Sequence, residues 1–430
     1  MKIIQMTGYF YPEKAASSYL SDNRNDAFAK AGFNVHIYTP VPTRGVSDDI
    51  RKEFSKKEHR QEQLFGGGVT VHRFSMYREG KNPILRALRY TLCWLYQFHK
   101  ALWVKDVDVF YLSSTPPIQG LIGSWVGRIR NRPFVYNLQD VFPDSLVGTN
   151  MASKGGLLWV FGRWIENMTY KGASKIIVIS QDFKRNIMAK GVPEEKIEVV
   201  YNWVDENAII PVKDEENELF EEFGIGREKF RVVYAGNLGN AQNIEIIVEA
   251  AKRLKDKGNI EFVIFGTGGL EDEIKAIKEK DELDNLKILP LQPYERVAKV
   301  YGLGHVCIVA CKPGLGGAAM PSKTWSIMSS GRAVLANFEE GELKEIVEGV
   351  PSTGPSTSSG TDSGTAKPCG VFTKAGDLEG FVAAIEELSQ HPERCAEMGR
   401  NGRQFILENL TREVGTRRYV EVIRQVAGER

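Results

Sequence analysis

Two carboxylates follow an apolar run that has the composition of a buried β-strand. Residues 134–139, FVYNLQ, are rich in strand-forming side chains, and Asp140 and Asp144 come directly after them, separated by Pro143. Open parallel sheets bind their ligands at the edge where the strands end. Asp140 is therefore a candidate ligand-binding carboxylate, and the alternative is an ordinary turn residue.

Lys323 is the most unusual cation of the chain. Residues 311–336 form a glycine-rich loop that carries Lys312 and leads into a predicted helix ending at Gly331. Ser322 is expected to cap this helix and Lys323 to occupy its first turn. A cation there opposes the helix dipole, and an anionic ligand would remove the conflict. The pattern predicts an anion-binding lysine, and the alternative is a solvent-exposed one.

Glycines and small polar residues follow three further strand patterns, an arrangement that suits phosphate groups. None of these loops has the GxGxxG spacing of a dinucleotide site, and each could be an ordinary strand–helix loop. The first loop, residues 7–18, contributes Gly8, Glu13, Lys14 and Ser17, with Ser17 or Ser18 as a helix cap. The other candidates are Gly236, Asn237, Gly239, Asn240, Gln242, Gly266, Gly268 and Gly269.

Strand and helix patterns alternate along the whole chain and must position these residues. Apolar strands separated by helices predict parallel sheets that are covered on both faces. The pattern restarts after a connector at 204–213, so we expect two doubly wound α/β domains, 1–204 and 205–410, and a last helix at 411–430 that could pack back on the first domain. Thr115 is the expected N-cap of one helix, after Ser114, and Ser180 of another.

Composition describes a soluble protein with 42% hydrophobic and 26% charged residues. No segment has the run of about 20 apolar residues that a membrane span needs, and the first residues are typical of a strand and not of a signal peptide. The five scattered cysteines are expected to be core thiols in a reducing cytoplasm. Residues 351–368 contain little besides Ser, Thr, Gly and Pro, which predicts a flexible insertion, natural or foreign, without chemistry.

The net charge of +1 is unevenly distributed. Residues 1–200 carry 28 Lys+Arg against 18 Asp+Glu, a net +10, and the remainder carries −9. Within the basic half, the predicted helix 83–105 interleaves basic residues with aromatic ones. Such a helix suits an anionic membrane surface, and the alternative is a core helix with a wet face. Chance and solvated helix faces are the alternative for the charge asymmetry. Nucleic acid is not among the expected partners.

Five motifs in this order resemble the retaining GT-B glycosyltransferases of family 4, above all the bacterial enzymes of O-antigen, capsule and colanic-acid synthesis, with the fucosamine transferases among them. The motifs are YFYPE at 9–13, DVFPD at 140–144, YNWVD at 201–205, YAGNLGNAQ at 234–242 and MPSK with SSGRAVLA within 320–336. The resemblance implies two Rossmann-like domains facing a cleft, the first binding the acceptor and the second a nucleotide-diphosphate sugar. It also implies that no metal is required and that helix N-termini and cations stabilise the leaving diphosphate.

The chain departs from the family pattern at three places. Many members have a histidine where Gln139 stands, and arginine and lysine in place of Asn237 and Gln242. The usual pair of glutamates would fall on Ala318 and Ser326. We infer that Lys323, with Lys312, supplies the phosphate charge, and that Asp140 bonds the acceptor hydroxyl or the donor sugar.

The resemblance thus predicts a sugar transferase using a nucleotide-linked hexose, UDP-linked and N-acetylated or 6-deoxy. Its expected acceptor is a saccharide or a polyprenyl-diphosphate-linked sugar at the inner face of the plasma membrane. Three alternatives stay open: a nucleotide-sugar 2-epimerase of the same fold, a non-catalytic nucleotide-sugar-binding subunit, and, with weaker support, a nicotinamide dehydrogenase. The sequence does not decide the donor base, the sugar or the acceptor.

Overall fold

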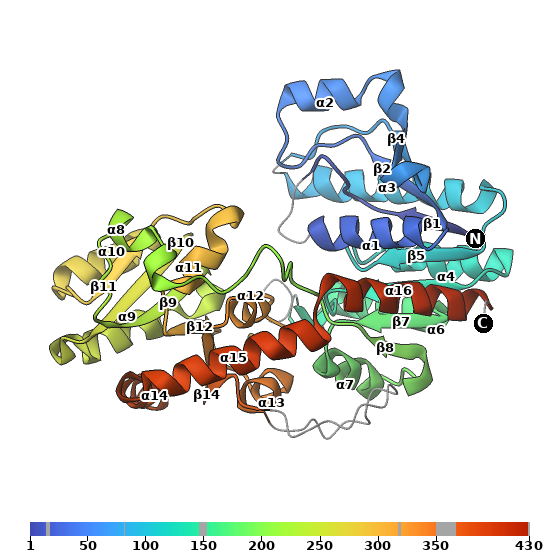
Figure 1. Ribbon diagram of the computed structural model, residues 1–430. Helices are drawn as coiled ribbons and strands as arrows, with labels where there is room; N and C mark the ends of the chain where they lie inside the picture. Colours follow the sequence, from blue (N-terminus) through green and yellow to red (C-terminus); the bar gives the residue numbers. More distant parts are fainter. Residues whose placement is uncertain (14–17, 81, 146–152, 317–319, 350–366, 429–430) are drawn as a thin grey trace. The chain divides into compact units, whose positions relative to one another are not determined.

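The computed structural model describes residues 1–13, 18–80, 82–145, 153–316, 320–349 and 367–428. The chain forms two compact units, each built around its own sheet (Figure 1). Unit 1 comprises residues 1–202 and 413–430, and unit 2 comprises residues 203–412. Lys14 and Ser17, together with nearly all of the low-complexity segment 351–368, lie outside the described residues.

Unit 1 contains an eight-stranded sheet in the order β3-β4-β2-β1-β5-β6-β7-β8. All neighbouring strands are parallel except β3, which pairs with β4 in the antiparallel sense at one edge. The strands are β1 (Lys2–Met6), β2 (Asn34–Pro40), β3 (Gln61–Leu64), β4 (Val69–Phe74), β5 (Val109–Ser113), β6 (Phe134–Leu138), β7 (Lys175–Val178) and β8 (Ile197–Val199).

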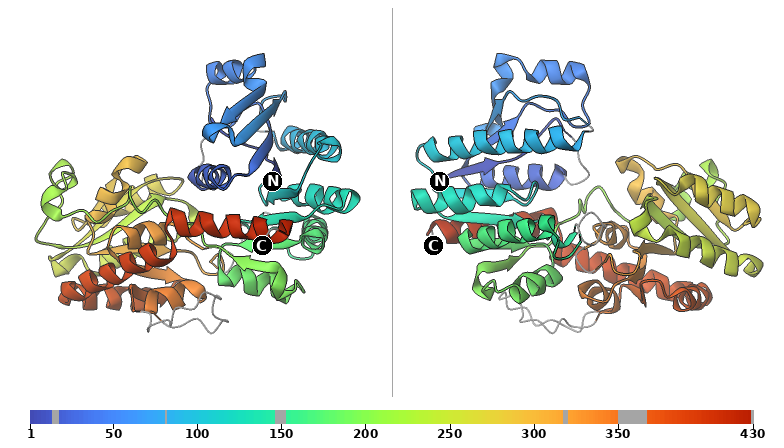
Figure 2. Two further views of the ribbon diagram at one scale, coloured as in Figure 1. Left: turned by 45° about the vertical axis from the view of Figure 1, so that its right-hand side comes forward. Right: turned by 180° about the vertical axis from the view of Figure 1, so that it is seen from behind.

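The helices of unit 1 cover both faces of this sheet, as apolar parallel strands require. They are α1 (Ser18–Lys30), α2 (Asp48–Phe54), α3 (Pro83–Trp103), α4 (Gln119–Arg130), α6 (Leu157–Gly172), α7 (Gln181–Ala189) and α16 (Arg412–Ala427). Helices α1 and α16 lie on one face and α3, α4 and α6 on the other (Figures 1 and 2). The strand side chains alternate accordingly: Tyr111 of β5 contacts the rings of Phe28 and Tyr419, whereas Tyr136 of β6 contacts Tyr170 of α6.

The C-terminal helix α16 belongs to unit 1, although the residues before it belong to unit 2. Tyr419 Oη donates a buried hydrogen bond to Asn137 Oδ1 of β6 at 3.0 Å. Arg418 Nε donates to Glu198 of the last strand, β8, at 2.9 Å. The end of the chain therefore completes one helical layer of the first unit.

Unit 2 contains a six-stranded parallel sheet in the order β11-β10-β9-β12-β13-β14. Its strands are β9 (Phe230–Asn237), β10 (Ile260–Thr267), β11 (Leu286–Leu289), β12 (Val306–Ala310), β13 (Ala333–Phe338) and β14 (Gly370–Lys374). Its helices are α8 (Leu219–Glu222), α9 (Ile244–Arg253), α10 (Glu271–Lys280), α11 (Val297–Gly302), α12 (Lys323–Ser329), α13 (Glu342–Glu348), α14 (Leu378–Gln390) and α15 (Pro392–Asn409). Buried aliphatic and aromatic side chains of β9, β10 and α9 form the centre of its core.

Two expected helix caps are wrong, and one is confirmed. Helix α4 begins at Gln119, with Ile118 in the cap position, because Thr115 and Pro116 each precede a proline and are thereby disfavoured in the helical conformation. Ser322 has helical dihedral angles and makes no capping bond, since its side chain cannot reach the free amides from that conformation. Ser180 caps α7 by accepting from Phe183 N at 3.1 Å.

All five cysteines are free thiols and buried, which confirms the expectation of core cysteines. Burial raises the pKa of each of these thiols, to about 11 for Cys311 as an example. Within the described residues, no helix has the length and apolar character to cross a bilayer.

Candidate functional site

Three loops of unit 2 meet where the central strands of its sheet end. Strands β9 and β10 pair up to Asn237 and Thr267, and the next amide, Leu238 N, donates to Thr267 O at 2.9 Å. The loop after β12 joins them, because Lys312 N donates to Ala241 O at 2.9 Å. The glycine loops and the lysine loop predicted as anion-binding therefore form one continuous surface.

Close contact between these loops depends on two of the predicted glycines. A Cβ atom on Gly266 would lie 2.5 Å from Gly236 O, and one on Gly268 would lie 2.5 Å from Leu238 O. Neither backbone oxygen could tolerate such an approach, so both positions exclude larger residues. Gly266 and Gly268 thus act by packing the loops together, whereas Gly236, with its φ of +147°, brings bare backbone next to Lys323.

Lys323 is the first residue of α12, and its ammonium group is buried beside the end of β9. Nζ lies 4.0 Å from the centroid of the Tyr234 ring, a cation–π contact. A Cβ atom on Gly236 would come within 2.8 Å of Nζ. Tyr234 is itself held in place, because its hydroxyl donates to Asn237 O at 2.8 Å. The lysine is therefore fixed against the loop 236–238.

Within the described part of the chain, the Lys323 ammonium has no hydrogen-bond acceptor and no ion-pair partner. Desolvation lowers its pKa from 10.5 to about 8. Burying a charge without a partner is costly, and proteins tolerate it mainly where a ligand or a function compensates. The alternative of a solvent-exposed lysine is wrong, and the arrangement leaves a directed cation for an anionic ligand.

The other predicted polar residues of unit 2 are differently placed. Lys312 Nζ forms an ion pair with Glu245 at 2.7 Å, so its charge is already compensated. Asn237 and Asn240 are exposed, and Asn237 Nδ2 lies 3.4 Å from Gln242 Oε1, a weak hydrogen bond. Gly239 lies at the turn between these amides, where an added Cβ would crowd both Asn237 and Gln242.

Asp140 lies two residues after the end of β6, close to where the sequence predicts it, and lines a small pocket in unit 1. Its carboxylate accepts a hydrogen bond from Ser145 Oγ at 3.0 Å. Desolvation and the like charge of Asp144 raise the pKa of Asp140, and the hydrogen bond from Ser145 opposes them. The pocket is lined by Pro117, Tyr136, Leu138, Asp140, Phe142, Ile165, Glu166, Thr169 and Tyr170.

The neighbouring carboxylates are neutralised by cations. Lys190 Nζ lies 2.7 Å from Asp144 and 2.8 Å from Glu166, and Arg163 also pairs with Glu166. Asp140 has no ion-pair partner among the described residues. Asp140 is therefore the carboxylate of this pocket that is available to a ligand.

Gln139 is half-buried, and its backbone and side chain are engaged in hydrogen bonds. Its backbone N donates to Ser114 Oγ at 3.0 Å. Its side-chain Nε2 donates to Asn137 Oδ1, and its Oε1 accepts from Asn202 Nδ2, both at 2.9 Å. Asn137 also accepts from Tyr419 of α16. These hydrogen bonds fix the backbone before Asp140. Asn137 and Asn202 were not predicted from the sequence, because their role depends on contacts with distant elements.

The described part of the first loop of unit 1 is held by hydrogen bonds and close packing. Glu13 is buried, and its Oε1 accepts from Thr43 N and Arg44 N, both at 2.7 Å. An added Cβ on Gly8 would lie 3.3 Å from Pro116 Cδ, so that glycine permits close packing of two loops. Thr115 is exposed beside them.

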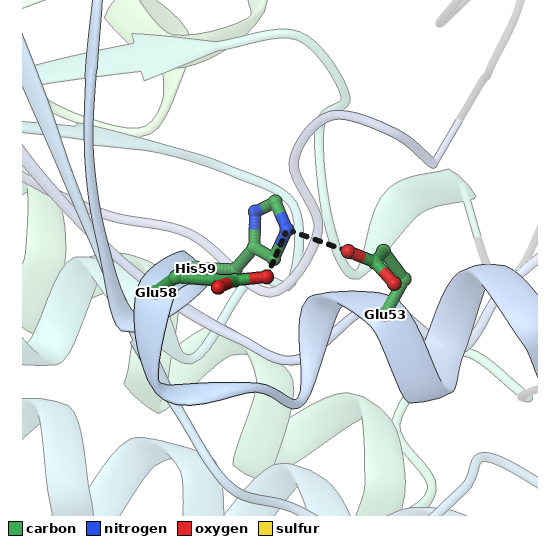
Figure 3. Close-up of side chains that lie close together, drawn as sticks. All are labelled: Glu53, Glu58 and His59. Carbon is green, nitrogen blue, oxygen red and sulfur yellow. Dashed lines mark hydrogen bonds and ion pairs between the residues drawn. The ribbon is translucent and has the colours of Figure 1, made fainter.

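Among the described residues, one group of side chains has the geometry to hold a metal ion: Glu53, Glu58 and His59, on the surface of unit 1 (Figure 3). His59 Nε2 lies 3.2 Å from Glu53, and Nδ1 lies 2.6 Å from Glu62. The hydrogen bond to Glu62 raises the pKa of His59. Glu53 also pairs with Lys56 at 2.6 Å, so the group is a surface ion-pair network whose charge is already compensated.

Two family models match the chain, one in each unit. The model described as "Glycosyl transferase 4-like domain" matches residues 26–203, and the model described as "Glycosyl transferases group 1" matches residues 215–405. The chain belongs to the family 4 glycosyltransferases. This glycosyltransferase is 28% identical over 360 residues to WcaI of Escherichia coli, which is named for colanic acid biosynthesis, covering 82% of this chain and 87% of WcaI. It is 27% identical over 218 residues to the glycosyltransferase WbjE of Pseudomonas aeruginosa, covering 50% and 54% of the two chains.

Solved structures place the glycosyltransferase in the GT-B fold, which confirms the expected fold class. Sucrose-phosphate synthase of Thermosynechococcus elongatus superposes with a TM-score of 0.71 at 14% identity, covering both chains completely. Anabaena HepE in complex with UDP superposes with a TM-score of 0.69 at 15% identity, covering 99% of this chain and all of HepE. The protein is an enzyme, a glycosyltransferase.

Proposed function

We propose that unit 2 binds a UDP-linked sugar and that Lys323 binds its diphosphate. The observation that carries the proposal is the buried ammonium of Lys323, which has no hydrogen-bond partner among the described residues and is held beside the backbone of Gly236. Solved structures of the same fold bind this class of donor: Anabaena HepE was crystallised with UDP and with UDP-glucose. The negative charge of a diphosphate would compensate the buried positive charge of Lys323.

In this proposal Lys323 replaces the two cations that many family members carry where this chain has Asn237 and Gln242. Negative charge grows on the diphosphate as the bond to the sugar breaks, and a fixed cation stabilises that charge without reorganising. The loop amides and the two side-chain amides add neutral hydrogen bonds. The chemistry then needs no metal ion.

Unit 1 supplies the acceptor side of the proposal. Asp140 accepts a hydrogen bond from the acceptor hydroxyl, and Gln139 holds the backbone before it through Ser114 and Asn202. The hydroxyl oxygen attacks the anomeric carbon from the face that the diphosphate leaves, and its proton passes to the departing diphosphate, so the configuration is retained. The acceptor is a saccharide or a polyprenyl-diphosphate-linked sugar of a cell-surface polysaccharide, encountered in the cytoplasm at the inner membrane face, and the donor sugar is N-acetylated or 6-deoxy.

Titration calorimetry with UDP, GDP, dTDP and uridine tests the donor site. UDP should bind best, and Lys323→Met should weaken UDP by about 10–100-fold while leaving the much weaker binding of uridine unchanged, because only the diphosphate contacts the lysine. Lys312→Met is the matched control, since Glu245 already pairs with that lysine. Equal UDP affinity of the wild type and Lys323→Met would contradict the proposal.

The acceptor side is tested by donor turnover. Asp140→Asn keeps the shape of the side chain and removes its charge, and we expect kcat for UDP release to fall by about 100-fold while UDP affinity is kept. In the wild type, kcat should fall toward low pH with a midpoint above the ordinary range for Asp, in line with the raised pKa of Asp140. Full activity of Asp140→Asn would make Asp140 a turn residue.

A further inference from the structure

Two helices on one face of unit 1 expose large apolar side chains to solvent. Leu157 of α6 is 92% exposed and Ile84 of α3 is 76% exposed. The exposed apolar residues of the two helices, here called the apolar face, are Ile84, Leu85, Leu88, Leu92, Leu95, Tyr96, Trp103, Leu157, Leu158, Val160, Phe161 and Trp164. Contiguous exposed apolar surface of this kind marks a contact with a membrane or a partner.

The apolar face is continuous because α4 packs between the two helices (Figure 2, right-hand view). Trp125 of α4 contacts Trp94 of α3 and Trp164 of α6 edge to face, with ring centroids 5.8 and 6.3 Å apart. Three tryptophans thus connect the helices at their surface. Tryptophan is the residue most typical of the boundary between lipid tails and headgroups.

The solvent-facing side of α3 is apolar. The alternative considered from the sequence was a core helix with a polar, solvated face. Leu85, Leu88, Leu92 and Leu95 follow the spacing of one helical stripe and are all exposed, while Arg89 and Gln97 of the same helix are buried. The guanidinium group of Arg89 is buried inside the unit, where it donates to Tyr77 O and Thr43 Oγ1. The helix therefore turns part of its polar side inward and its leucines outward, the reverse of an ordinary surface helix.

Positive charges outnumber negative ones around the apolar face. Helices α3, α4 and α6 together contain seven Lys and Arg residues and one carboxylate, Glu166. Of the seven cations, Arg89 is buried and Arg86 is paired with Glu79 at 3.1 Å. The Glu166 side chain is 2% exposed and paired with Arg163 and Lys190, so it contributes no surface charge. Arg128, Arg132 and Lys154, at the ends of these helices, are exposed and have no ion-pair partner among the described residues.

We propose that the apolar face and its flanking cations dock on the surface of an anionic phospholipid bilayer. Helices that lie in a membrane interface combine an apolar side, basic flanks and few carboxylates. A second copy of the chain fits less well, because a two-fold contact would place the same uncompensated cations against one another. Lipid phosphates complement them instead.

Membrane docking would bring the pocket of Asp140 close to the bilayer. Helix α6 carries both surfaces: Phe161 and Trp164 belong to the apolar face, and Ile165 and Tyr170 line the pocket. An acceptor anchored in the membrane would then reach Asp140 by diffusing in the plane of the bilayer. This last consequence rests on the proposed function, whereas the docking itself does not.

Co-sedimentation with vesicles tests the docking without donor or acceptor, so its failure and that of the proposed function are distinguishable. The wild-type protein should bind vesicles of phosphatidylcholine mixed with phosphatidylglycerol, and binding should weaken as salt screens the cations. The double substitution Leu157→Glu with Phe161→Glu should reduce the partition coefficient by at least about tenfold, since it removes apolar contacts and adds repulsion. Both side chains are more than half exposed, so folding should be kept, which circular dichroism checks.

The matched control is Leu291→Glu with Leu407→Glu, two apolar residues of unit 2 that are 50% and 49% exposed. This variant should bind anionic vesicles like the wild type. Equal loss in both variants, or equal binding to vesicles of phosphatidylcholine alone, would overturn the proposal. Sedimentation velocity that shows a dimer dissociated by the α6 substitutions, without vesicle binding, would assign the apolar face to a second copy instead.

Discussion

At the residue scale, Lys323 combines a cost in stability with a proposed function. Its native pKa of about 8 lies below the ordinary value of 10.5. Below about pH 8 the lysine is protonated in both folded and unfolded states, and the full penalty of burying the charge is present. Between the two pKa values the unfolded state binds more protons, so the free energy of unfolding rises with pH in that window.

We therefore predict that Lys323→Met stabilises the glycosyltransferase while impairing UDP binding. The free energy of unfolding at neutral pH should increase by about 1–3 kcal/mol, less than the full shift implies because the Tyr234 ring partly compensates the charge. The gain should shrink as pH rises from about 8 to about 10.5. Urea unfolding at neutral and alkaline pH measures both effects.

Lys312→Met, which removes a lysine that Glu245 already pairs, should change stability by no more than about 0.5 kcal/mol at either pH. A destabilised Lys323→Met at neutral pH would mean that the ammonium is compensated in the free protein. The lysine would then be structural.

The sequence indicated which residue types belong to the site but not how they are held. Lys323 was identifiable from its place at the start of a helix, yet its burial depends on Tyr234, which comes from a strand nearly ninety residues earlier. Lys312 looked equivalent until Glu245 of α9 was found beside it. Glu13 belongs to the YFYPE motif, and only the fold shows that its Oε1 accepts hydrogen bonds from the backbone of Thr43 and Arg44. Pairing between distant elements decides such roles.

At the element scale, the proposed donor site is formed by loops and not by helices. The loops that follow β9 and β10 pack closely together, and this contact fixes their positions. We predict that Gly268→Ala weakens UDP binding by about tenfold or more, because the new Cβ would lie 2.5 Å from Leu238 O and displace the loop next to Lys323. Gly269→Ala is the control, since an added Cβ there has no atom within 4 Å. Titration calorimetry with UDP compares the two.

Similar UDP affinities for Gly268→Ala and Gly269→Ala would show that the loop tolerates displacement and that its geometry does not control donor binding. Thermal unfolding should accompany the titration, because a clash with backbone also lowers stability. A loss of affinity in Gly268→Ala that is absent at low temperature would indicate partial unfolding instead.

The elements that sequence patterns predicted well are the ones whose local signal is strongest. The run NVHIYTP, which forms β2, has a clear strand signal, because its apolar residues alternate and proline closes it. The hairpin of β3 and β4 was missed, since QEQL has no apolar periodicity and gains its strand conformation by pairing at the sheet edge. The start of α4 was misplaced by Pro116 and its neighbour, whose effect on the preceding residue outweighs the capping signal.

At the scale of the whole molecule, the restart of the strand–helix pattern predicted two units, and their boundary lies at 202/203, two residues before the expected one. The sequence predicted that α16 could pack on unit 1 but did not decide it, because no local feature of the helix shows which unit it contacts. What fixes α16 is a set of long-range contacts: Tyr419 with Asn137 and Arg418 with Glu198.

Two units with separate cores should unfold in separable transitions, and UDP should act on one of them first. We predict that saturating UDP raises the transition of unit 2 by about 5–10 °C, because a ligand at a hundred times its Kd adds about 2.7 kcal/mol to the folded state. Deleting residues 412–430 should lower the other transition, since unit 1 loses the helix that buries Tyr419.

Differential scanning calorimetry of the wild type, Lys323→Met and the 412–430 deletion separates these effects. Lys323→Met should lose most of the shift caused by UDP, and the deletion should keep it, because the lysine and the helix belong to different units. If the deletion abolished the UDP shift, or if UDP moved only the transition that α16 controls, the donor site could not reside in unit 2. The buried Lys323 site would then bind an anion other than a nucleotide diphosphate.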